Sequence, residues 1–158
     1  MSNILIYVLI IIMSYTDIIR GLLDHQYPST EQTKTIVISN IVLRIIPLPS
    51  KPYFLRYEHL ETLILSKCDL RNLENFPKLL SLKQLDISEN SLHGTLNYLM
   101  PLSRLNYLNI SNNLIEDFRK LQPLQMIEGL EIYVAGNPFV DGETWKTKVR
   151  NYGLKVIK

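Results

Sequence analysis

Apolar residues recur in part of this chain at an uneven spacing that neither a helix nor a lone strand explains. In LKQLDISENSL, residues 82–92, they occupy the first, fourth, sixth and eleventh positions, and an asparagine, Asn90, occupies the ninth. Strict alternation would give a period of two residues, and a buried helical face would give spacings of three and four residues. The segment therefore indicates a more specific structure than either element.

The same pattern returns at a nearly constant distance. It is complete in LNYLNISNNLI, residues 105–115, and in LETLILSKCDL, residues 60–70, where Cys68 replaces the asparagine. A weaker copy ends at Asn137 and has a glycine in place of its first leucine. From Cys68 to Asn90, Asn113 and Asn137 the steps are 22, 23 and 24 residues. A period of this length is typical of a leucine-rich repeat.

Each position in the repeat has a physical reason. The central x-L-x-L-x segment predicts a short strand whose leucines point inward and whose other residues point outward. The asparagine follows the strand, where a turn buries backbone groups that its side chain can satisfy. Stacked coils would form a parallel sheet, and no coil buries its core alone, so both ends need caps. The sequence therefore predicts an α/β solenoid, an arc with a parallel concave sheet, an N-terminal helical cap and a C-terminal cap.

We divide the chain into an apolar extension or upstream start (1–13), an N-terminal cap with the first coil (14–57), leucine-rich repeats (58–137) and a C-terminal cap (138–158). In the N-terminal part, residues 16–26 predict a short amphipathic helix with Thr16 as its N-cap. Residues 33–40 resemble a repeat strand, and residues 45–54, with three prolines, predict an irregular connection.

The C-terminal segment does not follow the repeat. Residues 144–152 predict a short helix, and residues 154–157 predict a final strand that covers the open edge of the sheet. Trp145, Val149 and Tyr152 are expected to pack inward.

The apolar segment ILIYVLIIIM, residues 4–13, is too short to cross a bilayer as a helix, so no stable membrane insertion is expected. Three interpretations stay open: a dispensable extension upstream of a start at Met13, a packed apolar segment, or a targeting signal. As a signal it has no preceding Lys or Arg and no clear small-residue cleavage site.

Composition and motifs exclude several classes of function. With 158 residues the chain is one domain, and its net charge of +2 favours no particular partner. The single cysteine excludes an internal disulfide. The three histidines lie far apart, and the sequence has no phosphate-binding glycine loop, no H-E-x-x-H motif and no spaced Cys/His set. We therefore expect no enzyme activity, no cofactor and no metal, and nucleic acid is not an expected partner.

Solenoids usually bind through the concave sheet, where outward strand positions align across coils. Tyr107 and Tyr133 should be diagonal neighbours in this array. Tyrosine is favoured at binding hot spots, so we predict a partner-binding patch there, although the two tyrosines could also be incidental residues of an exposed sheet. The candidate residues are Thr62, Gln84, Asp86, Tyr107, Asn109, Glu131 and Tyr133.

The segment FPKLLSLKQLDISENSLHGTLNYL, residues 76–99, resembles the acidic leucine-rich nuclear phosphoprotein family. The particular cue is SLHGTL, with a glycine after the asparagine turn and a leucine that opens a short convex helix. The N-P turn at Asn137 and the following W-K-x-K-V are similar to the C-terminal cap of that family. This cap also occurs in the leucine-rich subunit of a spliceosomal ribonucleoprotein and in a leucine-rich regulator of type-1 phosphatase.

The resemblance implies a leucine-rich repeat protein without enzyme activity, a right-handed arc of about five strands with short helices on its convex side. It also implies a nuclear and cytoplasmic protein that binds a histone, a phosphatase or another nuclear protein. The family carries an acidic tail after the cap, whereas residues 144–158 contain five cationic and no acidic residues. Functions of that tail, including histone attraction, are therefore not expected to transfer in full. The alternative is a structural subunit of a spliceosomal-type RNA–protein assembly, with a protein on the concave face and the basic cap near RNA.

Overall fold

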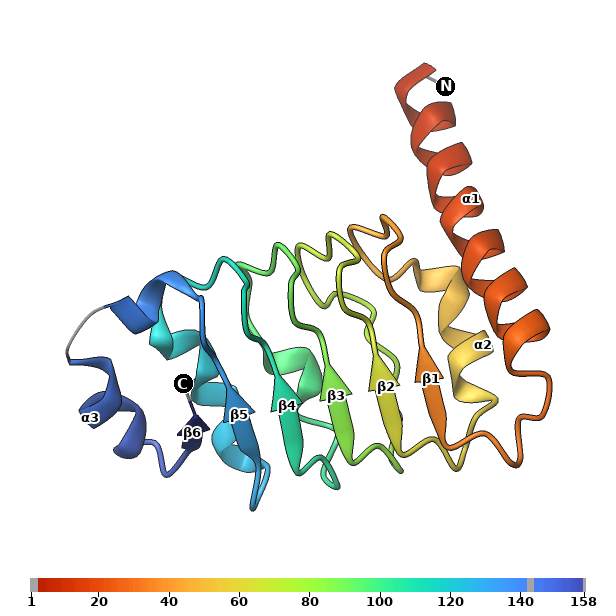
Figure 1. Cartoon of the computed structure of the whole chain (residues 1–158). Helices are drawn as coiled ribbons and strands as arrows, with labels where there is room; N and C mark the ends of the chain where they lie inside the picture. The colour runs from red at the N-terminus through yellow and green to blue at the C-terminus, as the bar shows by residue number, and fades with distance from the viewer. Residues whose placement is uncertain (1–2, 142–143, 158) are drawn as a thin grey trace.

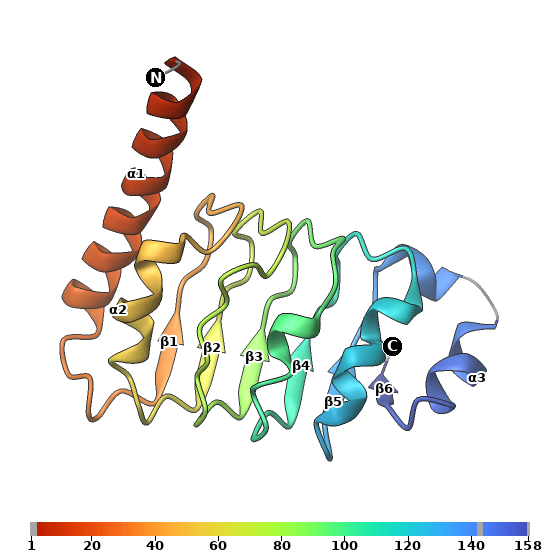
Figure 2. The same ribbon diagram turned by 180° about the vertical axis from the view of Figure 1, so that it is seen from behind.

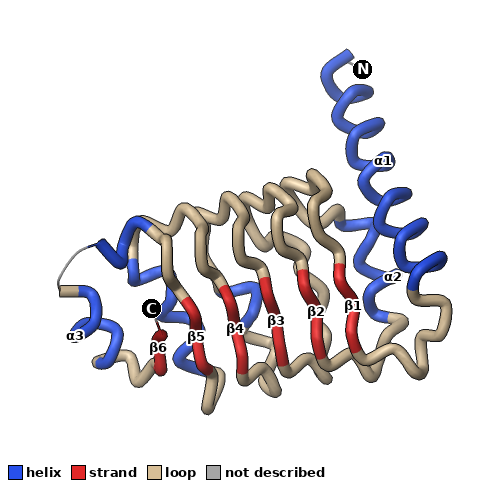
Figure 3. Tube along the Cα trace, viewed as in Figure 1, coloured by secondary structure: helices blue, strands red, loops and turns tan. Residues whose placement is uncertain are grey.

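Six short strands lie side by side in one parallel sheet, in the order of the sequence. The computed structural model describes residues 3–141 and 144–157. Figure 1 shows the strands stacked in sequence order, and Figure 3 shows that loops make up most of each coil. This arrangement confirms the leucine-rich repeat solenoid, with six strands instead of about five. The strands are β1 (Thr35–Val37), β2 (Thr62–Ile64), β3 (Gln84–Asp86), β4 (Tyr107–Asn109), β5 (Glu131–Tyr133) and β6 (Lys155–Ile157).

The register of the sheet follows the leucine pattern. Leu63, Leu85, Leu108 and Ile132 lie opposite one another on successive strands, and all four are fully buried. Tyr133 remains partly exposed. The weaker fourth copy therefore has the predicted register, because a slip of one residue would have exchanged the faces of Ile132 and Tyr133.

Asparagines tie each coil to the one before it. Asn90 accepts hydrogen bonds from the backbone N–H groups of Cys68 (2.9 Å) and Leu70 (3.0 Å), and its amide donates to the carbonyl of Leu65 (2.8 Å). Asn113 and Asn137 make equivalent bonds one and two coils further on. At the cysteine position, Cys68 is fully buried, and burial raises the pKa of its thiol. The predicted role of the asparagine turn is confirmed.

The convex side of the coils holds short helical turns, which cover the back of the sheet in Figure 2. They bury apolar side chains such as Leu99 and Leu121. The turns are η1 (Leu48–Ser50), α2 (Lys51–Leu55), η2 (Asn97–Leu99), η3 (Phe118–Met126) and η4 (Pro138–Asp141).

The irregular connection predicted for residues 45–54 is wrong, because η1 and α2 lie within it. Pro49 lies in η1, and Pro52 is in the first turn of α2. A proline in the first turn leaves no intrahelical hydrogen bond unmade. These prolines are therefore compatible with helical turns.

The N-terminal cap is a single helix, α1 (Asn3–Gln26), which is much longer than predicted. Ile19 and Leu23 are fully buried against the first coil and Leu22 is partly buried, so these three positions of the predicted apolar face are confirmed. Ile18, which the pattern assigns to the same face, is 42% exposed, so that part of the prediction is wrong. Thr16 is not the N-cap, because the helix already includes the thirteen residues before it. The first turns of α1 project beyond the repeats in Figure 1.

The side chains of residues 1–14 lie outside the described part, so the three interpretations of residues 4–13 remain predictions. Across the residues that are described, no helix combines the length and apolarity needed to cross a bilayer. The division of the chain into four segments also stays a prediction.

The C-terminal cap covers the last coil as expected. A short helix, α3 (Trp145–Arg150), precedes β6, which pairs with β5. Trp145 and Val149 are buried, and the ring of Tyr152 stacks on that of Phe118 with centroids 6.0 Å apart. These inward contacts agree with the sequence pattern.

Candidate functional site

All seven candidate residues lie on the face of the sheet opposite the helical turns, which we call the concave face. They alternate along the strands with the buried leucines, so the pleat of each strand turns them outward. The register places them in two columns. The first contains Thr62, Gln84, Tyr107 and Glu131, and the second contains Asp86, Asn109 and Tyr133.

The two tyrosines meet across neighbouring strands. The ring centroids of Tyr107 and Tyr133 lie 4.9 Å apart with an interplanar angle of 39°. The rings are diagonal because Tyr107 lies opposite Glu131, while Tyr133 lies opposite Asn109. Both side chains are partly buried, and together they form one aromatic surface.

Two polar side chains beside the tyrosines are fixed by local hydrogen bonds. The amide of Asn109 donates to Asp86 Oδ2 (3.1 Å), and Asp86 Oδ1 accepts from the backbone N–H of Ser88 (2.9 Å). Asn109 Oδ1 in turn accepts from the backbone N–H of Ser111 (3.0 Å). The carboxylate therefore has a defined orientation before any partner binds, which lowers the entropy lost on binding.

The carboxylate of Asp86 is also close enough to affect Tyr107. The pKa of Tyr107 is raised, first by burial and then by the negative charge of Asp86 and by Tyr133. In the described part of the chain, no cation forms an ion pair with Asp86. Its charge is thus available to a partner, beside two aromatic rings.

The second acidic candidate, Glu131, already has a cationic partner within the sheet. Glu131 forms an ion pair with Lys155, its direct neighbour on β6, and this contact raises the pKa of Lys155. Sequence reasoning missed the pair. The signal was present, since the column continues 24 residues beyond Glu131.

The remaining two candidates lie at the other end of the first column. Thr62 Oγ1 is 3.5 Å from Gln84 Oε1, and Gln84 lies directly beside Tyr107 in the sheet. Gln84 is exposed, so it can add a hydrogen bond at the border of the aromatic surface.

We define the tyrosine patch as Asp86, Tyr107, Asn109 and Tyr133.

The described residues bring no three His, Cys, Asp or Glu side chains together in a metal-ligating group. The tyrosine patch contains two tyrosine rings, one amide and one carboxylate, and this chemistry suits recognition of another molecule.

Comparison with known proteins finds relatives by sequence and a solved structure with a similar fold. No protein-family model matches the chain. Over 102 residues it is 38% identical to acidic leucine-rich nuclear phosphoprotein 32 family member A of Drosophila pseudoobscura pseudoobscura and to that of Drosophila melanogaster. Over 114 residues it is 33% identical to acidic leucine-rich nuclear phosphoprotein 32-related protein 1 of Oryza sativa subsp. japonica.

These matches cover 65%, 65% and 70% of this chain, but only 36%, 37% and 22% of the relatives. The chain thus spans about a third or less of the relatives' length. The names of these three relatives describe nuclear phosphoproteins and mention no enzyme activity.

A solved structure shows the same fold. A chain in the crystal structure of the Drosophila melanogaster SNF/U2A′ complex aligns with a TM-score of 0.61 and 22% identity. The alignment covers 75% of this chain and 66% of that chain. The resemblance inferred from SLHGTL and the cap is confirmed by the sequence relatives. Over these 102 to 114 residues the chain is homologous to members of the acidic leucine-rich nuclear phosphoprotein 32 family.

Proposed function

We propose that this chain is a non-enzymatic protein-binding module that regulates nuclear proteins, with a histone or a phosphatase as partner. In this proposal it works in the nucleus and the cytoplasm, and the tyrosine patch is its contact surface. The names of the relatives support the nuclear part of the proposal. The observation on which the contact surface rests is the pairing of Tyr107 with Tyr133 beside the carboxylate of Asp86, which forms no ion pair within the described residues.

The chemistry of the patch favours a basic partner segment. An Arg or Lys side chain can lie over a tyrosine ring, where the ring quadrupole attracts the cation. The same cation can reach a carboxylate, and Asp86 is already oriented by Ser88 and Asn109. A lysine- and arginine-rich segment, such as histones contain, would satisfy both interactions at once.

The test is a variant with Tyr107→Ala, Tyr133→Ala and Asp86→Lys, measured for melting and for binding to core histones and to type-2A phosphatase. The three side chains are partly buried and make local contacts, so the variant should melt below wild type, and binding is compared at a temperature at which both chains are folded. Loss of the hot spot should weaken binding by about 2 kcal/mol or more, roughly thirtyfold.

The matched control has Tyr98→Ala, Met126→Ala and Glu128→Lys. These residues are exposed in η2, at the end of η3 and in the loop that follows. The control repeats the charge reversal and removes two large side chains away from the concave face, so its affinity should equal that of wild type. Equal affinity of the patch variant and wild type would refute the contact surface.

A pull-down from the native cell followed by mass spectrometry tests the class of partner. Histones or a phosphatase would support the proposal. A set of spliceosomal proteins would instead support the alternative, a structural subunit of an RNA–protein assembly. The fold of this chain, which resembles that of a chain in the SNF/U2A′ complex, is compatible with this alternative.

A further inference from the structure

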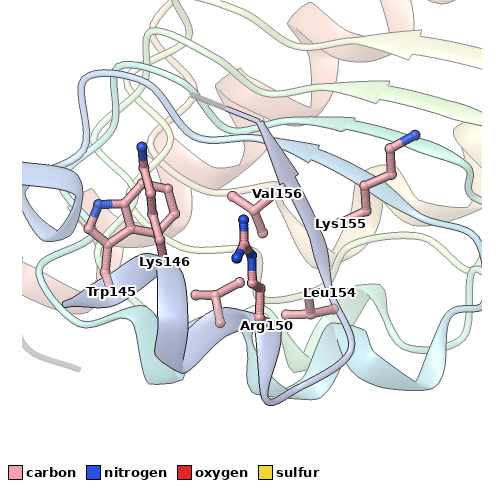
Figure 4. A pocket seen from close by; sticks show the side chains of 7 residues that line it. Trp145, Lys146, Arg150, Leu154, Lys155 and Val156 are labelled. Carbon is pink, nitrogen blue, oxygen red and sulfur yellow. The ribbon is translucent and has the colours of Figure 1, made fainter. Parts of the chain in front are cut away.

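A cavity separates the cap helix α3 from the edge strand β6. Its volume is about 410 Å³, and Figure 4 shows the side chains around it. Val149 of α3 and Leu154 and Val156 of the final segment supply apolar surface. Lys146 and Arg150 extend from α3 on the same side, while the side chain of Lys155 points away across β6.

The indole of Trp145 is a fixed wall of this cavity. Trp145 is 5% exposed, its Nε1–H donates to the carbonyl of Val140 (3.0 Å), and its ring meets that of Phe139 edge-on. Nucleic-acid sites that stack bases need an accessible aromatic face. This ring offers too little exposed surface for that role. Among the apolar side chains that line the cavity, Val156 is partly exposed, and its surface suits an aliphatic side chain as ligand.

Two cations of α3, Lys146 and Arg150, lie at this cavity. Lys146 and Arg150 are four residues apart in α3, so they lie on one face of the helix, where like charges repel each other. Within residues 3–141 and 144–157, neither forms an ion pair, in contrast to Lys155, which is bound to Glu131. The Lys146 ammonium lies 6.0 Å from the centroid of the Trp145 ring.

We propose that this cavity binds a short acidic peptide segment. One aliphatic side chain of the segment enters between α3 and β6, and flanking carboxylates meet Lys146 and Arg150. Charge complementarity favours this occupant, because carboxylates would relieve the repulsion between the two cations. The site is separate from the tyrosine patch, which suits a basic segment.

The experiment titrates the full chain with an acetylated hexapeptide, Asp-Glu-Leu-Glu-Asp-Glu, at low salt. Trp145 is the single tryptophan of the chain, so its fluorescence reports directly on the cavity. We expect a saturable change in fluorescence that weakens as salt is added, since exposed charges are screened. A peptide with Ser in place of Leu should bind at least tenfold more weakly.

The variant Lys146→Ala with Arg150→Ala should weaken binding of the acidic peptide at least tenfold. The matched control, Lys78→Ala with Arg104→Ala, removes one lysine and one arginine that are exposed elsewhere, and it should bind as wild type does. If the cap variant melts early, Lys146→Gln with Arg150→Gln preserves the side-chain stems and is titrated in its place. The patch variant should retain peptide binding, which separates this site from the proposed function.

Equal affinity of the cap and control variants would overturn the proposal. So would equal affinity for the Leu and Ser peptides, because the cavity would then have no occupant. A single-stranded oligouridylate that binds through Lys146 and Arg150, while the peptide does not bind, would show that the occupant is nucleic acid and overturn the proposed peptide.

Discussion

The ring of Tyr107 lies 4.9 Å from the ring of Tyr133, although the two residues are on different coils and are not direct neighbours in the register. The contact runs diagonally across β4 and β5. It depends on both strands keeping the same outward face. The pair therefore connects the register of the core to the chemistry of the surface.

The pair predicts how stability changes at alkaline pH. The pKa of Tyr107 in the folded chain is above its ordinary value of about 10, because of burial first and then Asp86 and Tyr133. As pH rises, the unfolded chain loses this proton before the folded chain does. The contribution of protonated Tyr107 to the free energy of unfolding is thus intact below the pKa of Tyr107 in the unfolded chain. It is lost as pH rises through the pKa of Tyr107 in the folded chain. Urea unfolding above about pH 10 should show a steeper loss of stability for wild type than for Tyr107→Phe.

Tyr98→Phe is the control, because Tyr98 is exposed on η2. Its pH profile should match that of wild type. Asp86→Asn should lower the pKa of Tyr107 in a spectrophotometric titration, since one negative neighbour is removed. An unchanged titration in Asp86→Asn would show that the carboxylate does not influence the ring.

The asparagine turns give a second prediction. In Asn90→Ala, the buried N–H groups of Cys68 and Leu70 would lose their acceptor. Each unsatisfied buried group costs about 1–3 kcal/mol, so the free energy of unfolding should fall by about 3 kcal/mol. Asn106→Ala, at an exposed position just before β4, should cost less than about 0.5 kcal/mol. Similar urea midpoints for the two variants would contradict the role of Asn90 in joining coils.

The middle of the fold could be predicted because its local and global signals agree. Leu85 and Leu108 mark the inward face, and Asn90 marks the turn, so the strands and their register follow from spacing alone. The repeat also placed the tyrosine patch, since Tyr107 and Tyr133 occupy outward positions of that same period.

The ends were harder because no period constrains them. Thr16 has the chemistry of an N-cap, but the helix continues before it to Asn3. Pro49 and Pro52 suggested an irregular connection, yet a proline is tolerated in the first turn of a helix, where both of them lie. The ion pair of Glu131 with Lys155 was not predicted, because Lys155 lies on β6, which does not follow the leucine pattern. The cavity between α3 and β6 was not predicted either, because it depends on how two non-repeating elements pack.

A third prediction concerns the core. Leu85 and Leu108 are fully buried and lie opposite each other on β3 and β4. Leu85→Asp or Leu108→Asp would place a carboxylate there without a partner, at a cost of several kcal/mol. Total stability of a domain is about 5–15 kcal/mol, so both variants should be largely unfolded by circular dichroism. Gln84→Asp, at the exposed neighbouring position, should keep the native spectrum and melting. Native-like melting of either core variant would contradict the register.

The final prediction concerns the C-terminal cap. Deletion of residues 138–158 removes α3 and β6, so the edge of β5 loses its partner strand. An unpaired edge with an apolar side invites association with other chains, and solenoids need polar caps for solubility. The truncated chain should aggregate or unfold, as measured by light scattering and circular dichroism. Trp145→Ala with Val149→Ala, which leaves β6 in the sequence but removes two buried side chains of α3, should lower the melting temperature with less aggregation than the deletion. A truncated chain that stays monomeric and melts like the full chain would show that this segment does not cap the repeats.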